Sequence, residues 1–317
     1  MLRKGGRSTG ISAALASALF LGLAPVFGKQ AISLGFSPLT VVALRTSLAA
    51  LTLLIIVAIF RRSYLFMYPA GLLGCGLAGA LNGIGSILYY MALQRLSVSV
   101  GQLLYSLYPI FLITWLIIDL QPPSKLTYLR VGLGLLGVIF LTTFRATSVD
   151  WVGVFLMLGA SAMYAIHLPI NQRVLYDIPA PTVTLYTLLA MSAVVVPAYL
   201  IFDRQMPPPN ASWTPVLMLT VVTFFSRLML FLGLKTLGGI QTALLGLSEL
   251  IVSVLVSHLW LHDSLNAYQW IGAGALALSL VLIGFEKIQP EKRHTHGLLA
   301  WLRPPEITPE IPWGPHE

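Results

Sequence analysis

The sequence predicts an all-α, polytopic membrane protein of ten transmembrane helices, arranged as two inverted repeats of five helices each. The composition, the spacing of the apolar runs and an internal repeat lead to this prediction. Of the 317 residues, 57% are hydrophobic and 9% are charged, whereas a soluble domain carries about 25% charged residues. An ordinary soluble fold could not hide this much apolar surface from water, so we place the chain in a lipid bilayer.

Apolar runs of the length that a bilayer requires follow one another along most of the chain. A hydrocarbon core of about 30 Å needs roughly 20 apolar residues per helix. The first run is long for the apolar core of a signal peptide, and a retained span fits it better. Pro25 and Pro109 fall inside runs and are expected to break local helix hydrogen bonds. On these rules we predict spans at 11–32, 38–60, 67–92, 98–119, 127–144, 150–170, 181–202, 214–235, 239–261 and 267–285.

One stretch of the chain occurs twice, at an offset of 141 positions. In residues 90–109 and 231–250 a hydrophobic helix ends in Ala/Gly-Leu-x-x-Leu, a few mostly small or β-branched residues follow, and a second helix begins. Repetition of this kind is typical of transporters built from two halves, with the site where the halves meet. Each half holds five spans, an odd number, so the second half enters the bilayer from the opposite side. We assign residues 11–145 to the first repeat and 150–285 to the second.

Lysine and arginine residues indicate the orientation. Most of the 19 basic residues fall on the side that holds both chain ends, and basic loops face the cytoplasm in membrane proteins. Residues 1–10 and 286–317 are therefore predicted to be cytoplasmic, with the protein in the plasma (inner) membrane. The last segment is charged and rich in proline, which predicts a disordered tail.

Several polar residues lie within the spans. An ionisable group at the bilayer centre costs at least ~2.5–3.5 kcal/mol on insertion scales, so such residues usually face a cavity or a partner. We predict a central cavity lined by the first, third, fourth, sixth, eighth and ninth spans, with the fifth and tenth at the periphery. The candidate substrate-binding residues are Asn82, Ser86, Gln102, Tyr105, Tyr108, Tyr164, His167, Arg227 and Glu249.

Some of the charged positions allow both a structural and a functional interpretation. Glu249 and Arg227 can form a structural pair between neighbouring helices, or they can line the transport pathway. His167 can take part in proton coupling, since imidazole titrates near pH 6.5, or it can bond between helices. Lys29 and Arg45 lie near the outer ends of their spans, so we expect both to extend outward to the interface; a basic vestibule for carboxylates is the alternative.

Four segments carry a resemblance to a known family. They are SPLTVVALR (37–45), YMALQRLSVSVGQLLYSLYP (90–109), GLGLLGV (132–138) and LHDSLNAYQWIGAGAL (261–276). In their order, spacing and duplication, the chain resembles the EamA family of the drug/metabolite transporter superfamily. The resemblance implies ten helices in two inverted halves, and export or exchange of small metabolites, often amino acids, by alternating access. The chain departs from the family after the fourth span, where an acidic residue is replaced by Pro122-Pro123-Ser124-Lys125.

The leading functional prediction is a secondary transporter of small metabolites, with amino acids or related zwitterions and anions as substrates. Lys29, Arg45 and Arg227 outweigh Glu249 in charge, which favours such solutes over simple cations. A multidrug or lipophilic-metabolite efflux carrier is the alternative, and an intramembrane enzyme is a less favoured one. The sequence contains no Gly-x-Ser-x-Gly elbow, no His-Glu-x-x-His motif and no Gly-rich nucleotide loop, so we predict that it is not an enzyme.

The expected partners are a small-molecule substrate and the lipid bilayer, with protons as a candidate coupling ion. We predict no cofactor, no metal site and no nucleic-acid partner, and the single cysteine, Cys75, lies within an apolar run. The sequence is compatible with a monomer or a homodimer, and with a proton-coupled carrier, an exchanger or a facilitator.

Overall fold

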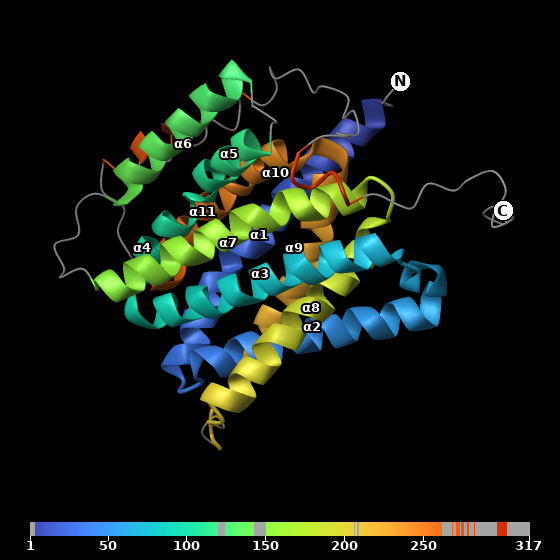
Figure 1. The fold of residues 1–317 in the computed structure, drawn as a ribbon. Helices are drawn as coiled ribbons and strands as arrows, with labels where there is room; N and C mark the ends of the chain where they lie inside the picture. The colour runs from blue at the N-terminus through green and yellow to red at the C-terminus, as the bar shows by residue number, and fades with distance from the viewer. Residues whose placement is uncertain are drawn as a thin grey trace, which may run out of the picture.

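The chain folds as a bundle of helices (Figure 1). The computed structural model describes residues 4–119, 124–142, 150–205, 207, 209–261 and 297–302, together with positions 268, 271, 272, 274, 275, 278 and 282. Within these residues the regular structure consists of eleven α-helices and one short 3-10 helix, η1 (Arg62–Leu65). This confirms the predicted all-α class.

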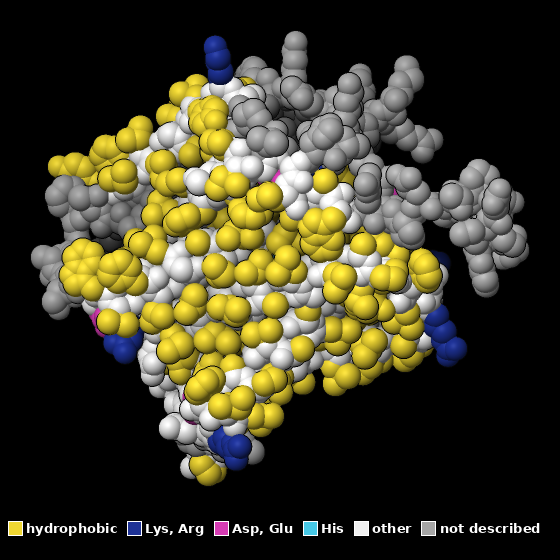
Figure 2. All heavy atoms as spheres, in the orientation of Figure 1, with side chains coloured by type: hydrophobic (Ala, Val, Ile, Leu, Met, Phe, Trp, Pro, Cys, Tyr) yellow, Lys and Arg dark blue, Asp and Glu magenta, His cyan; other side chains and the backbone are white. Residues whose placement is uncertain are grey.

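Six helices in the described part are long and apolar enough to cross a membrane. They coincide with six of the predicted spans. Figure 2 shows hydrophobic side chains over most of the visible face, with Lys and Arg at its margins, as expected of a surface that contacts lipid. The six are α1 (Lys4–Ser33), α2 (Pro38–Phe60), α3 (Pro69–Arg95), α7 (Trp151–Leu175), α8 (Ala180–Phe202) and α9 (Thr214–Leu237).

Side-chain caps fix the starts of two of these helices. The Ser37 hydroxyl accepts the Thr40 backbone N–H at 3.1 Å ahead of α2. Asp150 precedes α7 and accepts the Gly153 backbone N–H and an Arg95 guanidinium N–H, each at 3.1 Å. Both hydrogen bonds lower the pKa of the exposed Asp150 carboxyl, and the bond from Gly153 has the larger effect. The bonds to Ser37 and Asp150 occupy the backbone N–H groups of Thr40 and Gly153, which the first helical turn leaves without an intrahelical partner.

The predicted spans 98–119 and 239–261 are each divided into two helices; the sequence predicts a break at Pro109 in the first, whereas the break in the second corrects the expectation of a continuous span. The first comprises α4 (Val98–Tyr105) and α5 (Tyr108–Ile118), and the second comprises α10 (Gly239–Gly246) and α11 (Ser248–Leu261). At the repeat offset of 141, α4 corresponds to α10 residue by residue. The interruption therefore occurs at the same place, to within one residue, in both copies of the repeated stretch.

The first interruption has a direct cause in the sequence. The carbonyl of Tyr105 would accept the backbone N–H of Pro109 in a continuous helix, but proline has none. The hydroxyl of Ser161 in α7 donates to this carbonyl instead, at 2.9 Å. Pro25, by contrast, lies inside α1 without ending it.

The second interruption contains no proline. Here the backbone N–H of Leu247 bonds to Leu244 at 3.3 Å, three residues back instead of four. The Ala243 carbonyl accepts the hydroxyl of Tyr108 at 2.6 Å. Tyr108 thus connects the interruption of one repeat to that of the other.

The fifth predicted span is present as α6 (Lys125–Thr142), which lies at the edge of the bundle (Figure 1). The tenth, 267–285, falls mostly outside the described residues. Residues 297–302 form a turn that packs against α3 and α7, burying Leu299 and Leu302 next to Ala78 and Ile170. These six residues lie within the segment for which the sequence predicts a disordered tail, and their two leucines occupy an apolar site on the bundle.

An ion pair anchors the same end of the bundle. Arg173 at the end of α7 donates to the carboxylate of Asp119, which follows α5, at 3.1 Å, and both side chains are buried. Asp119 also accepts the backbone N–H of Leu299 at 3.3 Å. The turn at 297–302 is therefore held by a polar contact as well as by its leucines.

The bundle is built around α1, which packs along α9 and α11, and α3, which packs along α7 and α8. The approach of α1 to α11 is close: a Cβ added at Gly22 would lie 2.7 Å from the Glu249 carbonyl oxygen. The Ser253 hydroxyl donates to the Gly22 carbonyl at 2.7 Å. Glycine at this position lets α11 lie directly against α1 and so places Glu249 at the centre of the protein.

Candidate functional site

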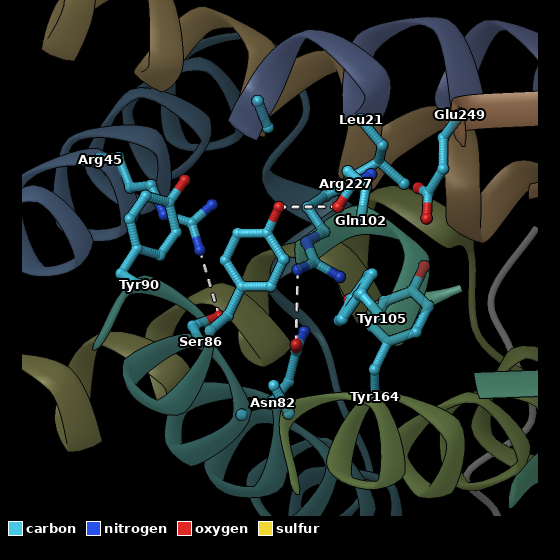
Figure 3. A pocket seen from close by; sticks show the side chains of 14 residues that line it. Leu21, Arg45, Asn82, Ser86, Tyr90, Gln102, Tyr105, Tyr164, Arg227 and Glu249 are labelled. Atoms are coloured by element: carbon cyan, nitrogen blue, oxygen red, sulfur yellow. Dashed lines mark hydrogen bonds between the residues drawn. The ribbon is translucent and has the colours of Figure 1, made fainter. Parts of the chain in front are cut away.

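A small internal cavity of about 50 Å³ lies at the centre of the bundle. A cavity of this size holds a few water molecules. All six predicted spans contribute to its wall, through α1, α3, α4, α7, α9 and α11, and α2 contributes as well (Figure 3). Its lining residues are Leu21, Ala24, Arg45, Asn82, Gly85, Ser86, Tyr89, Tyr90, Gln102, Tyr105, Ala160, Tyr164, Arg227 and Glu249.

Arg227 of α9 is 4% exposed and hydrogen-bonds to Asn82 of α3. Its Nη2 lies 3.4 Å from the Asn82 side-chain oxygen. With the amide turned over, that oxygen accepts from Nη1 at 3.0 Å and from Nη2 at 3.2 Å, which satisfies both groups better. The guanidinium also lies 5.9 Å from the centre of the Tyr164 ring.

Arg45 of α2 reaches into the same cavity and is 6% exposed. It donates to the hydroxyls of Thr223 at 3.2 Å and Ser86 at 3.1 Å, and its guanidinium lies 4.8 Å from the Tyr90 ring centre. The expectation that Arg45 extends outward is therefore wrong, because its hydrogen-bond partners and its ring partner lie inside the bundle. Lys29 is half-buried and donates to the Leu93 and Leu96 carbonyls at the end of α3.

Glu249, at the start of α11, is 2% exposed and faces the cavity. Its Oε1 has no hydrogen-bond partner among the described residues. The ion pair with Arg227, one of the two interpretations of the sequence, is not formed in this structure, because the Arg227 guanidinium bonds to Asn82 instead. Figure 3 shows the carboxylate of Glu249 on the side of Arg227 away from Arg45.

Tyrosines and a glutamine complete the wall. The Tyr89 hydroxyl donates to Gln102 Oε1 at 2.8 Å, and Gln102 Nε2 lies 3.5 Å from the Ser253 hydroxyl. The Tyr105 ring packs against Tyr89 with centroids 5.0 Å apart and against Tyr164 at 5.3 Å. Such rings offer apolar faces and a polar tip to an amphipathic solute.

Two predicted site residues lie behind this wall. Tyr108 packs edge-on against Tyr164, and its hydroxyl donates to the Ala243 carbonyl. The Nδ1 of His167 is hydrogen-bonded to the Tyr164 carbonyl, and its ring lies 4.7 Å from the Tyr164 ring. Neither residue lines the cavity, whereas the other seven predicted residues do.

The polar residues on α3 and α9 occupy equivalent positions of the repeat. At the offset of 141, Asn82 falls on Thr223 and Ser86 falls on Arg227. These four residues lie opposite one another, since Arg45 bonds to both Thr223 and Ser86, and Arg227 bonds to Asn82. The site therefore lies where the two halves meet.

The comparisons with known proteins agree with this architecture. The family model described as "EamA-like transporter family" matches residues 8–143 and 151–285. The chain belongs to the EamA-like transporter family. The match covers both halves, so the protein is a membrane transporter and its two repeats are the two copies of the family unit.

One relative and one solved structure show distant similarity to this transporter. It is 24% identical over 231 residues to "Uncharacterized transporter sll1319" from Synechocystis sp. (strain ATCC 27184 / PCC 6803 / Kazusa), covering 69% of this chain and 67% of that protein. A solved structure titled "Crystal structure of protein" superposes with a TM-score of 0.72 at 15% identity, over 88% of this chain and 97% of the other. At this identity the likeness concerns the fold alone.

Proposed function

We propose that this EamA-like transporter is a secondary carrier that exports or exchanges small metabolites, namely amino acids or related zwitterions and anions, by alternating access. One observation carries the proposal: two arginines and a glutamate line one buried cavity between the halves. Each such charge is costly inside a bilayer, and buried charges are normally paired. A solute with its own charges supplies the missing partners.

The arrangement of the helices supports alternating access. Discontinuous helices at corresponding positions of two halves are typical of the binding sites of secondary transporters, and α4–α5 and α10–α11 are such helices. The start of α7 also lies at the end of the bundle where α1 and α3 finish, since Lys29 bonds to Leu96 and Arg95 pairs with Asp150. These contacts support the proposal that the first helices of the two halves run in opposite directions, as an inverted repeat requires.

The small volume of the cavity also supports a moving carrier. A volume of about 50 Å³ lies far below the roughly 300–1,000 Å³ of ordinary small-molecule sites. An amino acid therefore enters only when the bundle opens to one side. The sequence has no nucleotide-binding loop, so we infer that a solute or proton gradient drives the cycle, with Glu249 as the group that exchanges the proton.

The experiment that tests this function uses the purified full chain in liposomes loaded with unlabelled amino acids, organic acids or nucleotide sugars. Counterflow of the labelled solute shows which class is exchanged. We expect amino acids to exchange and to leave the vesicles chemically unchanged. Exchange of nucleotide sugars alone, or chemical conversion of the solute, would refute the proposal.

One observation favours the alternative of a lipophilic-metabolite carrier. A groove of about 320 Å³ lies between α2 and α8, with mainly apolar walls that include Leu44, Val196 and Trp213. It is separate from the charged cavity, since the two share no lining residue. Counterflow of a lipophilic cation that survives replacement of Arg227 by Gln would support this alternative, because the charged cavity would then be dispensable.

A further inference from the structure

We propose that the substrate is an acidic amino acid, with one ammonium and two carboxylate groups. In this arrangement its two carboxylates bind Arg227 and Arg45 and its ammonium group lies at Glu249. The inference rests on the proposed transport function and narrows its substrate class. It follows from three features of the cavity: its charge balance, the spacing of its two arginines, and the position of Glu249.

The charge balance favours an occupant with one net negative charge. The cavity wall contains two guanidinium groups and one carboxylate. Both arginines bond only to neutral side chains, Thr223, Ser86 and Asn82, in the described part of the chain. A neutral zwitterion would leave one positive charge uncompensated in the bilayer, and an acidic amino acid leaves none.

Both arginines keep donors for a ligand. A guanidinium has five N–H donors in a planar fork that matches a carboxylate. Arg45 uses one donor for Thr223 and one for Ser86, and its Nε has no partner. The Nε of Arg227 is likewise without a partner, and both guanidinium groups line the cavity. Each side chain is more than nine-tenths buried, so bulk water does not reach these donors.

The spacing of the arginines fits two carboxylates of one small molecule. Arg45 bonds to Thr223 on α9, and Arg227 lies one helical turn further along that helix. On α3, Arg45 bonds to Ser86 and Arg227 bonds to Asn82, again one turn apart. One turn is about 5.4 Å, which is close to the separation of the two carboxylates in an extended acidic amino acid.

The position of Glu249 sets the orientation. The carboxylate of Glu249 lies beyond Arg227 as seen from Arg45 (Figure 3). The α-carboxylate and the ammonium group share one carbon atom, so they fit Arg227 and Glu249. The side-chain carboxylate then extends toward Arg45. Arg45 is therefore the residue that selects an acidic side chain over its neutral amide.

Counterflow in liposomes with the purified full chain tests the inference. Glutamate and aspartate are compared with glutamine and asparagine, which match them in shape and lack the second charge, and with succinate, which lacks the ammonium group. We expect wild-type exchange of glutamate or aspartate to exceed that of the matching amide at least about tenfold. Arg45→Gln should invert this preference, while the exposed Arg95→Gln should leave it unchanged.

The outcomes separate this inference from the proposed function. Exchange of glutamine or asparagine at the rate of the acids would overturn the acidic substrate and leave amino-acid transport standing. Unchanged preference in a folded Arg45→Gln protein would overturn the assignment of Arg45. If Arg45→Gln does not fold, the wild-type preference tests the acidic substrate and Arg45→Lys tests the role of Arg45. We expect Arg45→Lys to show a reduced preference for the acids. Exchange of neither amino acids nor organic acids would overturn both proposals.

Discussion

Glu249 shows at the scale of single residues how far the sequence predicts the site. Its presence within a predicted span indicated a buried carboxylate, and the structure places it at the cavity. An ion pair with Arg227, one of the two interpretations of the sequence, is not formed, because Arg227 bonds to Asn82 instead and the sequence does not determine side-chain direction. The prediction that Arg45 extends outward is wrong for the same reason. The distance from the end of a span gives the position of the backbone, whereas the guanidinium bonds to Thr223 and Ser86 on two other helices.

Replacement of Glu249 by Gln tests the role of this carboxylate. Because Glu249 has no ion-pair partner in the described residues, we expect Glu249→Gln to keep or raise the melting temperature. Transport should fall at least about tenfold or lose its pH dependence, since the amide cannot exchange a proton. The control is Asp203→Asn, at the exposed end of α8. Wild-type transport at every pH, together with a lowered melting temperature, would make Glu249 a structural residue.

At the scale of helices, hydrophobic run length predicted the six long spans well, because span length follows directly from bilayer thickness. It did not predict that two spans are divided. The expected break at Pro109 is present, since proline removes a backbone donor, but the break at Leu247 has no such residue. Contact with the other repeat accompanies it, as the Tyr108 hydroxyl binds the Ala243 carbonyl. Such a contact between residues far apart in the chain has no local signal.

Replacement of Pro109 by Ala tests the role of the divided helices. The new N–H can bond to the Tyr105 carbonyl and make α4 and α5 continuous, so we expect unchanged or higher thermal stability. Transport should slow at least about tenfold, because a continuous helix cannot bend at the cavity. Pro197→Ala, inside α8 and away from the cavity, is the matched control. If Pro109→Ala exchanges substrate as fast as the control, the division of this helix is not needed for transport.

Ser161 of α7 gives a related prediction for stability. Its hydroxyl donates to the Tyr105 carbonyl the hydrogen bond that Pro109 cannot donate. Removing this hydroxyl in Ser161→Ala leaves the Tyr105 carbonyl without a donor, which costs about 1–3 kcal/mol when the group is buried. Thermal unfolding in detergent measures the difference. An unchanged melting temperature for Ser161→Ala would show that another donor replaces the hydroxyl.

At the scale of the whole molecule, the internal repeat was the most informative part of the sequence. It placed the site between the halves, and the equivalence of Asn82 and Ser86 with Thr223 and Arg227 extends that relation to the cavity wall. The orientation in the membrane stays a prediction from the basic residues. Reporter fusions after Pro290 and at Pro207 should report the cytoplasm and the outside respectively. The same side for both would contradict the five-plus-five arrangement.

The central claim is that the charged cavity between the halves is the transport site, and counterflow with Arg227→Gln tests it most directly. This variant removes one positive charge at the centre of the cavity, while Arg95→Gln removes one at an exposed helix end. Both proteins are reconstituted at equal amounts after size-exclusion chromatography confirms folding. We predict that Arg227→Gln loses at least about 90% of amino-acid exchange and that Arg95→Gln retains it. Exchange by Arg227→Gln at the wild-type rate would contradict the account.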